Sequence, residues 1–347
     1  MRILIIGGTG FIGSHVVKHL DHAGHDVVLF RRGQTEDNSP PKVKNILGER
    51  LFLAEFSGEF RRLAPNVVID MIPATEQDAK VVISTFKGIA QRVVAISSMD
   101  VYRAYGRIHH TEPGSPDPIP LSEDAPLREK LYPYRGKYKD ADDYEKIVVE
   151  RVVMSDPALP GTVLRFPMVY GPRDNQHRFF DYLKRMDDKR PFILLDEGYA
   201  HWRGSRGYVE NIASAIALAT IDTRAAGHIY NAGEPTALST VELIREIGQV
   251  AGWQGEIVTA PKDHLPHHLS KDADTSQHWV IDTTRIRNEL GYKESVHQEE
   301  AIRLTIEWER ANPPTEIDTK MFNYAAEDAI VTGEFKQRAR ANTAWSR

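Results

Sequence analysis

The feature that most constrains the fold is a glycine-rich segment near the amino terminus, where residues 7–14 read GGTGFIGS. The segment directly follows the apolar run 3–6, whose continuous hydrophobicity is typical of a strand buried on both faces. It opens residues 12–22, in which apolar side chains recur at helical spacing. A strand, a glycine-rich turn and a helix in this order predict the first crossover of a parallel sheet covered by helices.

The spaced glycines of this turn have different roles in such a crossover. Gly7 permits the tight turn, Gly10 leaves room for a pyrophosphate to approach the backbone, and Gly13 lets the helix pack closely on the strand. The helix N-terminus offers unpaired N–H groups and a positive dipole end to phosphates. We therefore predict a dinucleotide-binding site whose residues are Gly7, Thr9, Gly10, Phe11, Ile12 and Gly13.

The alternation of strand and helix continues through the first half of the chain. Strand-like apolar runs lie at residues 27–30, 67–69, 93–96 and 162–164, and helix-like stretches lie at residues 78–89 and 141–154. We predict an α/β fold, a doubly wound parallel sheet of Rossmann type with a smaller C-terminal substrate domain. The predicted dinucleotide-binding domain covers residues 1–171, with 205–235 returning to it, and the smaller domain covers 172–204 and 236–347.

Elsewhere the pattern is looser. Residues 102–138 hold six prolines and little periodicity, which predicts a long irregular segment, either functional or a passive surface insertion. We predict a strand at residues 228–231 and helices at 211–220, 240–251 and 284–290, the last two ended by Gly252 and Gly291. The modestly basic tail beyond Thr332 is predicted to be a solvated helix or a frayed end.

The end of the second predicted strand bears on the choice of cofactor. An NAD site usually places Asp or Glu there for the ribose 2′-hydroxyl, whereas NADP sites use Arg. Here the strand runs into Arg31 and Arg32, whose guanidinium groups can pair with a 2′-phosphate. We expect NADP to be preferred and NAD to be the alternative, unless both arginines are ordinary surface charges.

Composition excludes several classes of site. The 347 residues contain no Cys, so thiolate nucleophiles, disulfides and Cys-based metal sites are excluded. Lys and Arg total 44 against 49 Asp and Glu, a net charge of −5 that makes nucleic-acid binding an unlikely role. No apolar run approaches the roughly 20 residues of a membrane span, so we expect a cytoplasmic protein. No metal site is expected, because the spacing is poor among His109, His110, His264, His267, His268 and His278.

The chain resembles the short-chain dehydrogenase/reductase superfamily, in its extended NAD-dependent epimerase/dehydratase branch. The resemblance rests on residues 7–13, on ISSMDVY at 96–102, on Arg165 through Pro172, and on later segments at 208–213, 230–233 and 282–292. It implies hydride transfer at a nicotinamide, as an epimerase, dehydratase or reductase. It also implies a small-molecule substrate such as a sugar or a nucleotide-linked sugar, and it is compatible with a homodimer.

The resemblance also implies roles for individual residues. Ser98 matches the catalytic Ser or Thr, and Lys146 matches the Lys that binds the nicotinamide ribose. Asp100 stands where some sugar dehydratases of the family carry an acidic base. Pro167 and Met168 lie in the segment at the nicotinamide end, and Arg203 and Arg206 lie where the family often holds a substrate phosphate. The plainer interpretations are a strand-end serine, an exposed helix lysine and surface arginines.

Two departures from the family concern the chemistry. The family places a Tyr four residues before its Lys, but here Asp142 precedes Lys146 at that spacing. Asp142 could pair with Lys146 across one helical turn, or act as an acid or base if it is buried. Tyr144 is two residues from Lys146, about 200° around a helix, and is predicted to miss its face. Tyr134 and Tyr138 could fold back to the site.

The second departure is Met168, which stands where many nucleotide-sugar members carry Asn. This departure speaks against a nucleotide-diphosphate sugar. The missing Tyr motivates the alternative to an enzyme, a non-catalytic nucleotide-binding or regulatory protein that keeps the cofactor fold. A third and weaker hypothesis is an RNA-associated protein, by analogy with atypical members of the superfamily. The net charge of −5 speaks against RNA binding.

Overall fold

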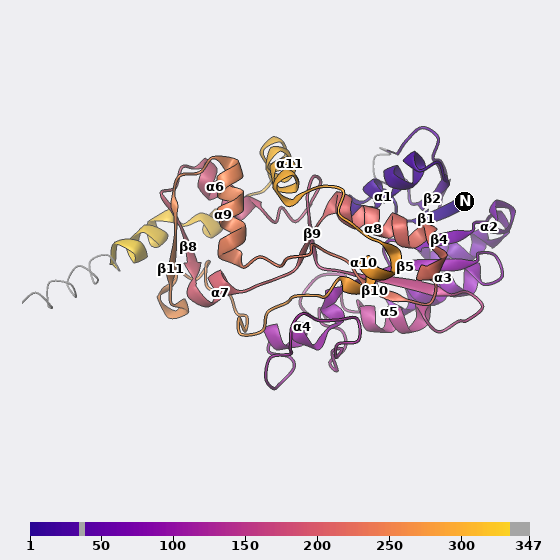
Figure 1. The fold of residues 1–347 in the computed structure, drawn as a ribbon, viewed down its shortest axis with the longest axis horizontal. Helices are drawn as coiled ribbons and strands as arrows, with labels where there is room; N and C mark the ends of the chain where they lie inside the picture. Colours follow the sequence, from indigo (N-terminus) through magenta and orange to yellow (C-terminus); the bar gives the residue numbers. More distant parts are fainter. Residues whose placement is uncertain (35–38, 334–347) are drawn as a thin grey trace, which may run out of the picture.

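The computed structural model describes residues 1–34 and 39–333. The molecule is elongated, with a large parallel sheet and its helices at one end and a smaller group of helices and strands at the other (Figure 1). The predicted tail lies almost wholly outside the described residues, which end at Gly333.

The large sheet has seven strands, all parallel, in the order β10-β6-β5-β4-β1-β2-β3. The order reverses next to β1, as in a doubly wound sheet. The strands are β1 Arg2–Ile6, β2 Asp26–Arg31, β3 Lys44–Leu47, β4 Val67–Asp70, β5 Arg92–Ser98, β6 Gly161–Phe166 and β10 Ile229–Asn231. The predicted Rossmann-type α/β fold is confirmed.

Helices cover both faces of this sheet, which explains why its central strands are largely apolar. Ile3 and Ile5 of β1 pack in one hydrophobic cluster with helices α1 (Phe11–His22) and α8 (Val209–Ile221). Leu4 and Ile6 point to the opposite face, into a second cluster with α2 (Ser57–Leu63) and α3 (Glu76–Phe86). Successive residues of a strand point to opposite faces, so continuous hydrophobicity is what two covered faces require.

The smaller end of the molecule contains elements that the sequence pattern did not predict. The parallel pair of β8 with β11 lies beside α7, and a second short pair, β7 with β9, packs against α8 of the large sheet. The elements are β7 Met168–Tyr170, α6 Phe180–Asp187, β8 Phe192–Asp196, α7 Glu197–His201, β9 Arg206–Tyr208, α9 Thr240–Ala251, β11 Glu256–Ala260 and α11 Gln298–Ala311. Helix α9 ends at Gly252 in the left-handed conformation (φ 75°), as predicted.

Helix α10 (Thr284–Leu290) contacts the large sheet. It ends at Gly291 as expected, but it packs against β10 of the large sheet although its residues fall in the segment 236–347. The hydroxyl of Tyr230 on β10 donates to Glu289 of α10 over 2.8 Å. The boundaries of the two domains stay a prediction.

Helix α5 (Lys146–Val153) is shorter than the predicted helix at residues 141–154. Asp140 has a left-handed backbone (φ 61°), and residues 142–143 form a turn. The side chain of Glu145 caps the helix by accepting from the N–H of Ile147 over 2.9 Å. Tyr144 is therefore not helical, and the prediction that helical geometry separates it from Lys146 is wrong.

The long segment at residues 102–138 is irregular apart from α4 (Arg103–Ile108), and it packs into the molecule. Its Arg128 is buried and donates to Glu145 over 2.9 Å. Glu112 accepts from the backbone N–H groups of Glu129 and Lys130, both at 2.8 Å. The segment is therefore tied to the residues just before α5.

Candidate active site

The glycine-rich turn has the geometry that a bound dinucleotide needs. A Cβ on Gly10 would point into open space, with no atom within 4 Å. A Cβ on Gly13 would lie 2.8 Å from the carbonyl oxygen of Gly7, so only glycine allows the helix this close to the strand end. Gly7 has φ 83°, and the side chain of Ile72, 52% exposed, lies against it. A bound cofactor fits this turn, because the space above Gly10 is open and an exposed apolar side chain borders it.

The residues expected at the adenosine end lie beside this turn. Arg31 ends β2 and donates from Nε to the side chain of Asn45 on β3 over 2.7 Å, and Arg32 is exposed. The two residues expected at the nicotinamide end follow β6. Pro167 lies between β6 and β7, and Met168 begins β7 and is half-buried.

A cluster of polar side chains lies at the carboxyl end of β5. The hydroxyl groups of Tyr144 and Tyr134 both donate to Oδ2 of Asp100, over 3.1 and 3.0 Å. Ser98 ends β5, and its side-chain hydroxyl accepts from the N–H of Asp100 over 3.2 Å. The ammonium of Lys146 lies 5.5 Å from the ring centre of Tyr144. In an open parallel sheet this edge is where ligands bind.

Burial dominates the electrostatics of this cluster. Asp100 is 1% exposed, and its Oδ1 has no hydrogen-bond partner. Burial raises the pKa of Asp100, against the attraction of Arg128, and burial lowers the pKa of Lys146 to about 8. Burial and the charge of Asp100 together raise the pKa of Tyr144 well above its ordinary value. Each ionisable group of the cluster is therefore held closer to its neutral form than it would be in water.

The surrounding structure fixes these groups in place. The ammonium of Lys146 donates to the carbonyl oxygens of Pro73, over 2.5 Å, and Ile96, over 2.9 Å. Nε of Arg165 donates to Glu150 over 2.9 Å, and Glu150 also accepts from Ser97 over 2.5 Å. These bonds join α5 to β5 and β6, so the start of α5 cannot shift without breaking buried polar contacts.

Of the residues singled out from the sequence, Asp142 lies outside the cluster, and the two arginines of the predicted substrate site are engaged by groups of this chain. Asp142 is exposed, and its carboxylate accepts from the N–H of Gly136 over 2.8 Å, so it does not pair with Lys146. Arg203 pairs with Glu242 over 3.2 Å. Arg206 is half-buried and donates to the carbonyl of Gly204 over 3.0 Å. The first placement follows from the late start of α5, which removes the helical spacing on which the Asp142 hypothesis depended.

Sequence reasoning did not assign Tyr144 to the site and left Tyr134 open. Tyr134 does fold back, and its ring centre lies 5.1 Å from that of Tyr144. Tyr138 is 65% exposed and stays outside. The signal that could have found Tyr144 is the pair of adjacent acidic residues 142–143, because Asp favours turns and helix caps over helix interiors.

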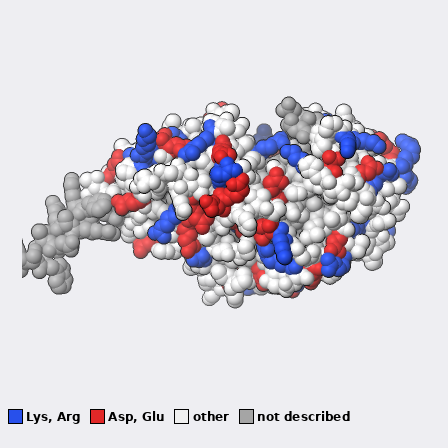
Figure 2. Space-filling view, turned by 45° about the horizontal axis from the view of Figure 1, so that its top comes forward, with Lys and Arg blue, Asp and Glu red and all other residues white. Residues whose placement is uncertain are grey.

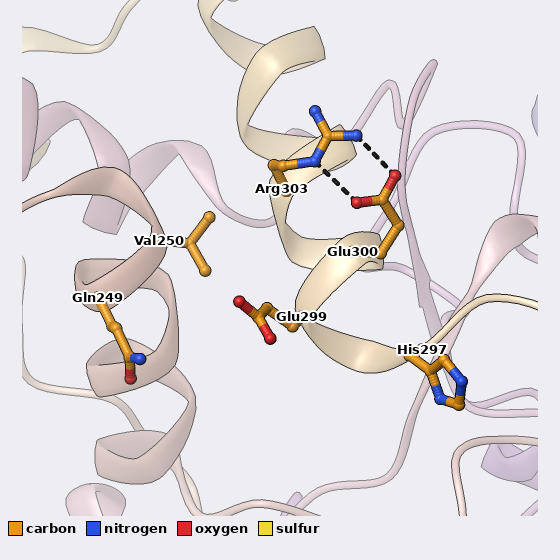
Figure 3. Close-up of a pocket in the computed structure, with 6 residues that line it drawn as sticks. All are labelled: Gln249, Val250, His297, Glu299, Glu300 and Arg303. Carbon is orange, nitrogen blue, oxygen red and sulfur yellow. Dashed lines mark hydrogen bonds and ion pairs between the residues drawn. The ribbon is translucent and has the colours of Figure 1, made fainter.

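A separate pocket lies between α9 and α11, away from this cluster (Figure 3). It has a volume of about 460 Å³ and is lined by Gln249, Val250, His297, Glu299, Glu300 and Arg303. Arg303 is engaged by Glu300 through two hydrogen bonds, of 2.7 and 2.6 Å. The pocket is a poor site for an anionic cofactor, because the guanidinium of Arg303 is paired with Glu300 and its rim carries acidic side chains.

The surface and the described residues add three further facts. On the face drawn in Figure 2, Lys and Arg side chains are interspersed with Asp and Glu and form no single basic surface. Within residues 1–34 and 39–333, no group of three His, Asp or Glu side chains is arranged to hold a metal ion. In the same residues no helix has the length and apolar character of a membrane span.

This fold and this site define a class of protein. A doubly wound sheet with an open glycine-rich turn, and with hydroxyl, carboxyl and ammonium groups at a neighbouring strand end, is typical of enzymes that use a nicotinamide dinucleotide. A model of the NAD dependent epimerase/dehydratase family matches residues 3–233. The chain therefore belongs to that family and is an enzyme with an NAD-binding Rossmann fold.

Individual relatives are distant but match most of the chain. The chain is 23% identical to UDP-N-acetyl-alpha-D-glucosaminuronate decarboxylase of Bacillus cytotoxicus, over 89% of this chain and 98% of that protein. It is 22% identical to UDP-glucose 4-epimerase of Dictyostelium discoideum, over 90% and 96%. The crystal structure of Thermus thermophilus UDP-glucose 4-epimerase with NAD has a similar fold, with a TM-score of 0.63 and 22% identity over 90% of this chain and all (100%) of that one.

Proposed function

We propose that the protein transfers a hydride between a nicotinamide dinucleotide and a nucleotide-linked sugar, and that Tyr144 handles the proton of the reacting sugar hydroxyl. One observation carries the proposal: the Tyr144 hydroxyl donates to the buried carboxylate of Asp100 at the carboxyl end of β5, the strand that Ser98 ends. The relatives named above act on UDP-linked sugars, which supports this substrate class.

The proton path would differ from that of the family. A nicotinamide, when bound, accepts or returns the hydride, so the protein has to move only a proton. The raised pKa of Tyr144 disfavours a standing phenolate. As the substrate hydroxyl gives its proton to the Tyr144 oxygen, the phenolic proton of Tyr144 passes to Oδ2 of Asp100, 3.1 Å away. Asp100 is thus the final acceptor in the oxidative direction, and its raised pKa makes it a stronger base.

Other residues of the cluster would support this relay. Ser98 can hydrogen-bond the substrate oxygen. The hydroxyl of Tyr134 donates to Oδ2 of Asp100, the oxygen that also accepts from Tyr144. Lys146 has three N–H donors, two of which are given to backbone carbonyls, so one is left for the nicotinamide ribose.

We further propose that NADP is preferred over NAD. Arg31 and Arg32 end β2, and the sequence there offers no carboxylate that would repel a 2′-phosphate. Replacing both by Ala should weaken NADP about tenfold or more and leave NAD nearly unaffected, as measured by titration calorimetry. A native protein that binds NAD more tightly than NADP would contradict this preference.

The function is tested with the purified protein and a panel of UDP- and dTDP-linked sugars. We expect at least one sugar to change the absorbance of the bound nicotinamide, and analysis of the product then separates epimerisation, dehydration and reduction. The Asp100→Asn variant should keep its cofactor affinity and lose about two orders of magnitude or more in kcat, because the relay has lost its acceptor. Full activity of a folded Asp100→Asn variant would refute the relay.

A further inference from the structure

The segment that follows β7 presents an arginine to the glycine-rich turn. Arg173 has a left-handed backbone (φ 76°) that side-chain-bearing residues rarely adopt, and it follows Gly171 (φ 137°) and Pro172. The next residue, Asp174, is buried and accepts from Nη1 of Arg178 over 2.7 Å and from the N–H of Gln176 over 3.0 Å. These contacts hold the backbone of the turn that carries Arg173.

Arg173 lies against the turn that opens α1. It lines a small pocket of about 10 Å³ together with Gly8, Thr9, Ser14 and Ser39. This volume has room for about one water molecule, so the arginine is in close proximity to the turn. In the described part of the chain Arg173 makes no ion pair or side-chain hydrogen bond, whereas Arg178, five residues later, is paired with Asp174.

A half-buried guanidinium that pairs with no carboxylate among residues 1–34 and 39–333 is suited to an anionic ligand. Its planar fork matches two phosphate oxygens, and the backbone N–H groups at the start of α1 favour the same negative charge. We propose that Arg173 is a clamp for the diphosphate of the bound dinucleotide. The inference rests on the proposed dinucleotide-dependent function and adds a residue from outside the glycine-rich turn to its cofactor site.

The clamp would also connect the cofactor to the smaller end of the molecule. Arg173 belongs to the connection between β7 and α6, and α6 packs against α9. A charge-assisted contact from this connection would hold the diphosphate from a second chain segment, and its loss should appear mainly as faster release of the dinucleotide.

The test compares Arg173→Met and Arg173→Gly with Arg151→Met, which removes an exposed arginine of α5. Glycine tolerates φ 76° without strain. The Arg173→Gly variant can therefore be measured even if the Arg173→Met variant does not fold. Binding of NAD, NADP and adenosine is measured by titration calorimetry. Both Arg173 variants should bind NAD and NADP about ten- to a hundredfold more weakly and adenosine unchanged, with a smaller dependence on salt. The Arg151 variant should bind all three like the native protein.

Three results would overturn the clamp. One is unchanged NAD affinity in a folded Arg173→Gly variant of a protein that still turns over its sugar substrate, which leaves the proposed function intact. Another is a loss confined to NADP, which would place the arginine on the 2′-phosphate. The third is a native protein that binds neither dinucleotide, which contradicts the proposed function together with the clamp.

Discussion

The hydroxyl of Tyr144 lies 3.1 Å from Oδ2 of Asp100, although the two residues are 44 positions apart in the chain. The carboxylate also accepts from Tyr134, so two phenols converge on a single buried oxygen. The proposed proton relay uses this pair, since Asp142 and not Tyr stands four residues before Lys146.

Removing the Tyr144 hydroxyl tests the relay directly. We expect Tyr144→Phe to lower kcat by about two orders of magnitude or more while the Kd for the dinucleotide stays within twofold, because only the proton path is broken. Steady-state kinetics and cofactor titration measure the two effects. Tyr138→Phe is the matched control, since Tyr138 is 65% exposed, and near-native turnover of Tyr144→Phe would show that Tyr144 is not in the path.

Replacing Gly10 or Gly13 of the turn by alanine should have different effects. The first substitution should mainly weaken dinucleotide binding, and the second should mainly lower stability. Gly10 has φ −76° and open space where the methyl group of an alanine would lie, so Gly10→Ala should cost at most about 1 kcal/mol of stability and weaken dinucleotide binding about tenfold or more. Gly13→Ala would bring a methyl group 2.8 Å from a backbone oxygen and should cost about 1–3 kcal/mol or more. Thermal unfolding and calorimetry separate these effects, and equal loss of stability in both variants would contradict the geometry.

Lys146 should make the free energy of unfolding vary with pH in the alkaline range. Its pKa is lowered to about 8 in the folded protein from 10.5, so between these values the unfolded chain binds more protons than the folded one. Stability relative to Lys146→Met should therefore rise with pH from about 8 to 10.5, by on the order of 3 kcal/mol at most. Urea unfolding at several pH values measures the difference. A difference that stays flat over this range would mean that Lys146 titrates normally.

The contact between α1 and α8 should contribute less to the free energy of unfolding at acidic pH. Glu210 of α8 accepts from His15 over 2.7 Å and His19 over 3.0 Å, both on α1. Despite burial, these hydrogen bonds hold the pKa of Glu210 below its ordinary 4.5, so the stabilisation is present above that pH and is lost as the pH falls below it. Glu210→Gln should cost on the order of 1 kcal/mol at pH 6, allowing for solvent screening of a half-exposed pair, and less at pH 4.

The exposed Glu59 of α2 provides the control for this prediction. Glu59→Gln removes the same charge from the surface without touching α1 or α8, and its effect should not change with pH over the same range. If Glu210→Gln behaves like Glu59→Gln in chemical unfolding, the two histidine contacts contribute nothing to stability.

The cofactor end of the molecule could be predicted because its signals are local. A buried-type strand, a turn with glycines at 7, 10 and 13 and an amphipathic helix follow one another within 22 residues, and each part needs only its neighbours to be interpreted. Six of the seven strands of the sheet were predicted, whereas β3 was not, because its side chains are mostly exposed and lack the pattern of a strand covered on two faces. The short strands β7, β8, β9 and β11 were missed because runs of three to five residues carry little periodicity.

The amino-acid sequence by itself determined the parallel sheet, the glycine-rich turn and the presence of Ser98 and Asp100 at the end of a strand. Only the tertiary structure decided which phenol joins them. The helical pattern from residue 141 is overridden at Glu145, whose carboxylate binds Arg128 and the backbone N–H of Tyr132 as well as its own helix. Those partners come from the long irregular segment, and no local pattern records them. Because they delay the start of α5, Tyr144 is left in extended chain beside Asp100.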